Sequence, residues 1–183
     1  MSQPSFDVDA ANKHFAVTCF NSVWELLDKE DRTPFEDQLM IERCLASIWH
    51  WSERPDRTPT NISIGYWQAS RVYAVIGNAF EARRYGELCL EASGGPGVES
   101  FALGYAFEAL ARAEKVAGNA EKAAEYLAQA RDTAECIDDE ESRQMQGYAA
   151  AVKHATGRSV VRAVLLFLRG ADDGSAVESD VSL

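Results

Sequence analysis

Three histidines, His14, His50 and His154, are the side chains of this sequence best suited to proton transfer or metal binding. They fall in three separate predicted helices, so a metal site or catalytic triad would need tertiary folding to assemble it. His50 has an indole on each side, in Trp49-His50-Trp51. We interpret this triplet as packing between helices, and keep a hydrolase-type site around His50 as a minor alternative.

Cysteine spacing and the motifs of common enzymes give no sign of chemistry. The four cysteines form no C-x-x-C pair, and their spacing predicts buried free thiols: Cys19, Cys44, Cys89 and Cys136. The chain contains no phosphate loop, Rossmann glycine pattern, H-E-x-x-H or G-x-S-x-G. The glycine-rich residues 94–97 lack the lysine of a phosphate loop. We therefore expect no catalytic residue, no metal and no cofactor.

Composition indicates a globular, strongly acidic protein. The 183 residues are 46% apolar and 26% charged, and 18 Lys and Arg stand against 29 Asp and Glu, a net charge of −11. Such a surface repels phosphates, which argues against nucleic acid and membrane partners. Residues 1–9 lack the basic and apolar parts of a secretory leader, and the apolar stretch 163–168 is too short to span a bilayer. These features predict a cytoplasmic protein.

Helical periodicity runs through the chain, and no segment alternates as a half-buried strand does. We expect an all-α protein of seven or eight helices in one domain, 1–169, followed by an acidic disordered tail, 170–183. Asp9 is expected to cap the first helix, Pro34 to open the second, and Thr60 or Asn61 to cap the third. Further helices are expected over 79–92, 98–117, 120–136, 138–156 and 159–169.

A shift of 41 residues superposes part of the chain on itself. The matched residues include Arg71 and Arg112, the turns Gly77-Asn78 and Gly118-Asn119, and Tyr85 and Tyr126. Small residues recur at three matched places, Ser70 and Ala111, Ala82 and Ala123, and Cys89 and Ala130. Helix axes roughly 8–10 Å apart leave no room for a large side chain at a crossing. The unit is therefore a helical hairpin with a glycine turn.

This repeated hairpin resembles the tetratricopeptide repeat (TPR) family over residues 62–134, and more weakly over 10–52 and 140–169. The resemblance implies a TPR-like α-α superhelix of stacked antiparallel hairpins, whose first helices line a concave groove. It also implies a non-catalytic module for protein–protein interaction. The lysine-and-asparagine pattern with which some members clamp a terminal carboxylate is not reproduced.

The family's groove positions suggest the binding residues. The main candidates are Trp67, Arg71, Tyr105, Glu108, Arg112 and Lys115, with Ile64, Ala74, Val75 and Val116 beside them. The three cations would form a basic stripe in an acidic protein, so we expect a protein or peptide partner with an acidic or carboxylate-bearing segment. The opposite interpretation, in which the arginines pair with Glu108, Glu81 or Glu114 for stability, remains open.

A second function also remains open from the sequence. The chain could be a small-molecule or peptide-sensing regulator with a pocket near Trp49, His50, Trp51 and Trp67. A closed pocket with convergent polar groups would favour this function, whereas an open trough would favour the interaction module. Homo-oligomerisation is compatible with either function.

Overall fold

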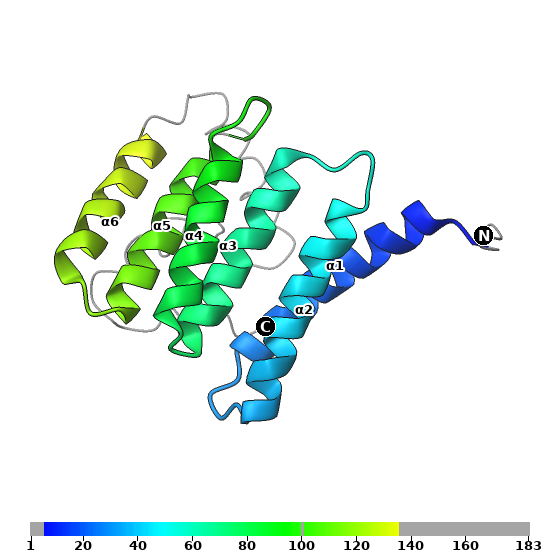
Figure 1. Cartoon of the computed structure of the whole chain (residues 1–183), viewed down its shortest axis with the longest axis horizontal. Helices are drawn as coiled ribbons and strands as arrows, with labels where there is room; N and C mark the ends of the chain where they lie inside the picture. The colour runs from blue at the N-terminus through cyan, green and yellow to red at the C-terminus, as the bar shows by residue number, and fades with distance from the viewer. Residues whose placement is uncertain (1–5, 100, 136–183) are drawn as a thin grey trace, which may run out of the picture.

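The structure is a computed structural model that describes residues 6–99 and 101–135 (Figure 1). These residues form six helices and no strand, which confirms the all-α class. The helices are α1 (Val8–Leu27), α2 (Pro34–Ser52), α3 (Pro59–Val75), α4 (Ala79–Ser93), α5 (Phe101–Val116) and α6 (Ala120–Glu135). The seventh and eighth helices and the acidic tail that we expect lie outside the described residues.

The first two helices begin on local capping signals. Asp7, rather than the expected Asp9, caps α1, because its carboxylate accepts the backbone N–H three residues on. Asp9 lies within the first turn, where its charge faces the positive end of the helix dipole. The expectation for Pro34 is confirmed, since it is the first residue of α2 behind a capping box of Thr33 and Glu36.

The start of α3 differs from the expectation by two to three residues. Thr58 caps the helix and Asn61 completes the capping box, whereas Thr60 and Asn61 were the expected caps. Pro59 explains the difference, because its fixed φ suits the first helical position and its missing N–H is not needed there.

Two glycine turns with the same hydrogen-bond pattern join α3 to α4 and α5 to α6. Gly77 and Gly118 have φ of 81° and 79°, a conformation that L side chains rarely adopt. The N–H of Asn78 donates to Tyr73 O at 2.8 Å, and the matching bond from Asn119 reaches Glu114 O at 2.9 Å. This six-to-one bond ends each first helix, so the next helix must run back antiparallel.

The small residues predicted for the helix crossings are buried, except for Ala123, which is half-buried. Ser70 shows the reason most directly, because its Oγ donates to Ala82 O at 2.8 Å across the α3–α4 crossing. Gly86 plays the same part between α4 and α5, since a Cβ there would stand 2.9 Å from a side-chain carbon of Leu110.

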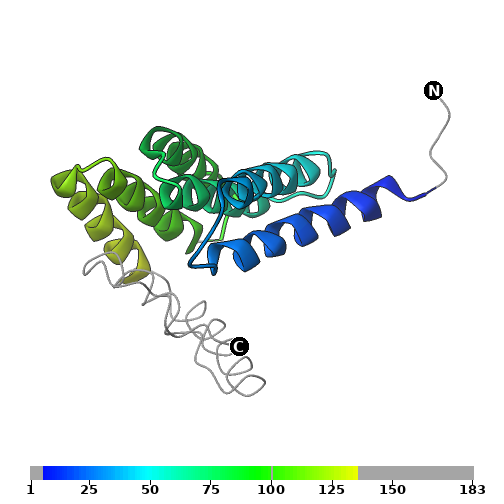
Figure 2. The same ribbon diagram turned by 90° about the horizontal axis from the view of Figure 1, so that it is seen from below.

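The helices follow one another in a row, and each packs on the next (Figure 1). In addition, α3 contacts both α1 and α5, so the first helix of each hairpin touches the first helix of the next one. In the second view, α1 and α6 lie at the two ends and α2–α5 lie between them (Figure 2). The largest core cluster joins α1–α4 and contains Val23, Leu26, Leu27, Met40, Cys44, Ala69, Val72 and Tyr85.

None of the helices within residues 6–99 and 101–135 has the length and apolar character needed to cross a bilayer.

Candidate functional site

Three aromatic rings form a continuous row across α1, α3 and α5. The centroids of Trp24 and Trp67 are 5.7 Å apart, and those of Trp67 and Tyr105 are 5.2 Å apart with the rings stacked. Trp67 is buried in the middle, whereas Trp24 and Tyr105 are half-buried at the two ends. We call Trp24, Trp67 and Tyr105 the aromatic row. It exists because α3 packs against both α1 and α5.

A buried carboxylate on α5 fixes the middle of this row. Glu108, only 2% exposed, accepts a hydrogen bond from Trp67 Nε1 at 2.9 Å through Oε2. Its Oε1 accepts from Arg112 Nη2, one helical turn further along α5. Glu108 therefore holds both the indole and the guanidinium in place, while the side chain of Arg112 keeps 26% of its surface exposed.

The other two cations are Arg71, on α3 beside the row, and Lys115, further along α5. The guanidinium of Arg71 lies over the ring of Trp24, 5.4 Å from its centroid, in cation–π geometry. Lys115 is exposed near the end of α5, three residues beyond Arg112. Burial, and secondarily the charge of Glu108, raises the pKa of Tyr105, so this phenol stays neutral.

The sequence-predicted residues thus occupy one region of α3 and α5. Five of them are joined by the aromatic row and its polar contacts: Trp67, Arg71, Tyr105, Glu108 and Arg112. Of the minor candidates, Ala74 is buried in a cluster with Ala82 and Ala113, whereas Val75 and Val116 are exposed. Sequence reasoning missed Trp24. Its signal in the sequence is the helical spacing of Ala16, Phe20, Trp24 and Leu27. This spacing indicates a packing residue but does not predict that Trp24 belongs to this row.

The alternative that the arginines serve as ion-pair partners holds in part. Arg112 does pair with Glu108, so this arginine has a structural contact besides its exposed edge. Glu81 and Glu114, in contrast, pair with two arginines of α4 that we did not assign, Arg84 and Arg83 respectively.

Glu114 is the centre of a second buried charge cluster. Arg83 approaches its two carboxylate oxygens at 2.7 and 3.0 Å, Asn119 Nδ2 donates at 2.6 Å, and Lys122 Nζ lies 3.4 Å away. These hydrogen bonds, the one from Arg83 first, lower the pKa of Glu114 to about 2 although its side chain is fully buried. The cluster ties α4, α5 and α6 together, and its groups are committed to each other.

The residues proposed for a sensing pocket are not gathered in one place. His50 Nδ1 lies 2.9 Å from Asn12 Oδ1, and its ring neighbours Phe15 and Trp49 between α1 and α2. Trp67, which belongs to α3, instead packs against Trp24 and Tyr105. The structure therefore separates His50 from Trp67.

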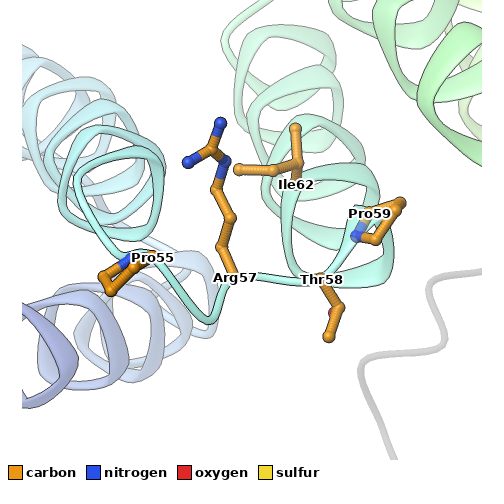
Figure 3. Close-up of a pocket in the computed structure, with 5 residues that line it drawn as sticks. All are labelled: Pro55, Arg57, Thr58, Pro59 and Ile62. Carbon is orange, nitrogen blue, oxygen red and sulfur yellow. The ribbon is translucent and has the colours of Figure 1, made fainter.

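A surface pocket of about 390 Å³ lies at the start of α3 (Figure 3). It is lined by Pro55, Arg57, Thr58, Pro59 and Ile62, and Arg57 and Ile62 extend into the space between α2 and α3. Arg57 Nη1 donates to Ser52 O at 3.0 Å and to Arg54 O at 3.2 Å. The charged group of this pocket thus stabilises the loop before α3.

Cys19, Cys44 and Cys89 are free thiols, as predicted, and Cys136 lies outside the described residues. Cys44 and Cys89 are also buried, whereas Cys19, which we expected to be buried, is half-buried. Burial raises the pKa of Cys44 to about 12 and that of Cys89 to about 11, which keeps both thiols protonated. No group of three or more His, Cys, Asp or Glu side chains within residues 6–99 and 101–135 is placed to hold a metal ion.

The aromatic row with Arg71, Glu108, Arg112 and Lys115 is therefore the candidate site. Comparisons of the chain with protein-family models, with curated proteins and with solved structures find no match. The geometry of the candidate site is therefore the basis on which a function can be proposed.

Proposed function

We propose that this protein is a non-catalytic interaction module that binds a protein or peptide segment across the aromatic row. The supporting observation is the row itself, which crosses three helices and ends in two half-buried rings, Trp24 and Tyr105. Trp, Tyr and Arg are the residues that most often dominate binding energy at interfaces, and the two aromatic ones offer large contact areas with few rotatable bonds. Glu108 adds to this by fixing Trp67 and Arg112 before a partner arrives.

The charge of the site suggests an acidic or carboxylate-bearing segment. Arg71, Arg112 and Lys115 outnumber Glu108 at the site, whereas the whole chain carries a net charge of −11. An acidic partner is thus repelled by most of the surface and attracted here, and this contrast guides its approach. Binding of this kind weakens as salt rises.

The proposal includes a TPR-like stack in the cytoplasm. It is supported by the two identical glycine turns and by the contact of α3 with α1 and α5, which brings the first helices of successive hairpins side by side. Rows of neighbouring first helices give repeat proteins an extended binding surface.

A sensing regulator is the second candidate, with a ligand at Trp49 and His50. One observation favours it, since the indole of Trp49 is exposed and stacks edge-on against His50. A ligand that quenches tryptophan fluorescence in the wild type but not in Trp49→Phe would support this candidate.

The test of the interaction module is selection of binders from a displayed random-peptide library on the full chain. Arg71→Gln is the site variant, and Arg84→Gln is its matched control, because Arg84 also covers a ring, that of Tyr85, but lies on α4. We expect selected peptides to lose about tenfold in affinity with Arg71→Gln and to keep it with Arg84→Gln. Binders that respond equally to both variants, or to neither, would place the partner on another face.

A further inference from the structure

Exposed apolar side chains are concentrated at one end of the molecule. Of the nine large apolar side chains that are exposed in the described residues, five belong to α1 or α2, and a sixth, Phe6, lies two residues before α1. They are Phe6, Val8, Phe15, Val17, Phe35 and Trp49. A terminal hairpin of a helical stack normally presents a polar outer face to water. The first hairpin departs from this rule, which indicates that something covers part of it.

The outer face of α2 carries the most exposed of these residues. Phe35, Glu42 and Trp49 are spaced by seven residues and so lie along one side of the helix. Phe35 is 74% and Trp49 56% exposed, and Glu42 between them accepts a hydrogen bond from Gln38. Phe15 of α1, 48% exposed, borders the same region through His50. We call Phe15, Phe35, Glu42 and Trp49 the outer stripe.

The hairpin that carries the outer stripe is acidic. Residues 8–52 contain eight acidic side chains and four basic ones. An occupant that complements this surface is therefore apolar and basic at once, with no acidic residue of its own.

One segment of this chain has that composition. Residues 158–169, Arg-Ser-Val-Val-Arg-Ala-Val-Leu-Leu-Phe-Leu-Arg, contain three arginines, no acid and eight apolar residues. In the helix that the sequence predicts there, Val161, Leu165 and Leu168 share one face, with Arg158, Arg162 and Arg169 along its edge. Residues 136–157 join it to α6 and can reach roughly 70 Å when extended, which exceeds the width of a small domain.

We propose that residues 158–169 bind the outer stripe of the same chain, with apolar side chains on Phe35 and Trp49 and an arginine beside Glu42. This contact buries the two most exposed aromatic side chains of α2 and pairs the most basic apolar segment with the acidic hairpin. It also returns the C-terminal part of the chain to the first hairpin.

Site-specific photo-crosslinking of the full chain tests this contact. A benzoyl-phenylalanine replaces Trp49 in one protein and Phe80 in a second, since Phe80 is even more exposed than Trp49 but lies on α4. After irradiation, the products are separated by mass and the joined peptides are sequenced by mass spectrometry. We expect the probe at position 49 to join residues 158–169 at the mass of one chain, and the probe at position 80 to give no such product.

Leu165→Glu supplies the second arm, because a carboxylate on the apolar face should lower the yield at position 49 about tenfold. Circular dichroism of each protein establishes that the helices persist. Products at the mass of two chains would overturn the proposal in favour of self-association. Equal yields from the two probe positions, no product, or a yield unchanged by Leu165→Glu would also overturn it.

Discussion

The two partners of the Arg83–Glu114 ion pair should differ in how much stability their removal costs. Arg83→Gln leaves the carboxylate of Glu114 fully buried, with only Asn119 and the more distant Lys122 to compensate it. Glu114→Gln leaves a guanidinium that is already 30% exposed and can turn toward water. Uncompensated buried charge is the expensive outcome. The arginine variant should therefore be the less stable of the two.

The structure sets the size of the difference. Removing one partner of a buried pair costs about 3–5 kcal/mol when the remaining charge stays buried, and about 1–2 kcal/mol when it reaches water. The lowered pKa of Glu114 points to the same size, because a drop from 4.5 to about 2 corresponds to roughly 3 kcal/mol of interaction with its surroundings. We expect a loss of about 3 kcal/mol for Arg83→Gln and about 1–2 kcal/mol for Glu114→Gln.

The stability difference between the wild type and Arg83→Gln should depend on pH, because folding lowers the pKa of Glu114. A carboxyl whose pKa is lowered by folding stabilises the native state above its ordinary pKa, and this contribution is lost as the pH falls toward the native pKa of about 2. The difference between wild type and Arg83→Gln should therefore be full at pH 7 and shrink steadily below about pH 4.

Urea unfolding followed by circular dichroism measures these free energies, with equal m values as the check that the native states are comparable. The double variant Arg83→Gln/Glu114→Gln gives the coupling energy, and it should be more stable than Arg83→Gln alone because no charge is stranded. A larger loss for Glu114→Gln than for Arg83→Gln would refute the reasoning. So would a difference that persists unchanged at pH 3.

Three further predictions concern the site and the fold. Arg112→Glu puts a second carboxylate beside buried Glu108 and should lower the free energy of unfolding by about 2–4 kcal/mol, whereas Arg112→Lys should cost about 1 kcal/mol; urea unfolding of both variants measures this. Ala111→Leu overfills a buried crossing and should cost about 1–3 kcal/mol, while Ala128→Leu on the exposed face of α6 should melt like the wild type. Circular dichroism of the whole chain should report more than half helix, and a sheet content above about a fifth would contradict the all-α class.

Local signals in the sequence predicted most of the helix boundaries. The turns at Gly77-Asn78 and Gly118-Asn119 needed no tertiary information, because a glycine with positive φ ends a helix by itself. At the first of these turns Asn78 also caps the next helix, since its side chain accepts the N–H of Glu81. The caps of α1 and α3 were predicted less accurately. Each start offers two or more side chains with a suitable oxygen, and the choice depends on where the backbone first turns helical. At α3 the proline at position 59 was the decisive signal.

Contacts between helices were harder to predict than boundaries. The 41-residue repeat relates Trp67 to Glu108 and therefore makes them equivalent positions on α3 and α5. It gives no reason to expect a hydrogen bond between them, because that bond depends on the rotation and distance of the two helices. Arg83 and Glu114 were missed for the same reason. Both are ordinary charged residues in the sequence, and only the packing of α4 on α5 buries the carboxylate.

The repeat also explains why the aromatic row is centred on α3. At equivalent positions the first unit has an indole donor, Trp67, and the second a carboxylate acceptor, Glu108, so the two units interlock through unlike groups. Two tryptophans could stack there but would fix no guanidinium, and two glutamates would repel each other in a buried setting. Glu108 joins the two hairpins through its hydrogen bond with Trp67, and it also accepts a hydrogen bond from Arg112. The same carboxylate thus orients a cation at the proposed binding site. Under the proposed function, stability and binding depend on the same carboxylate, and a variant of Glu108 should change both.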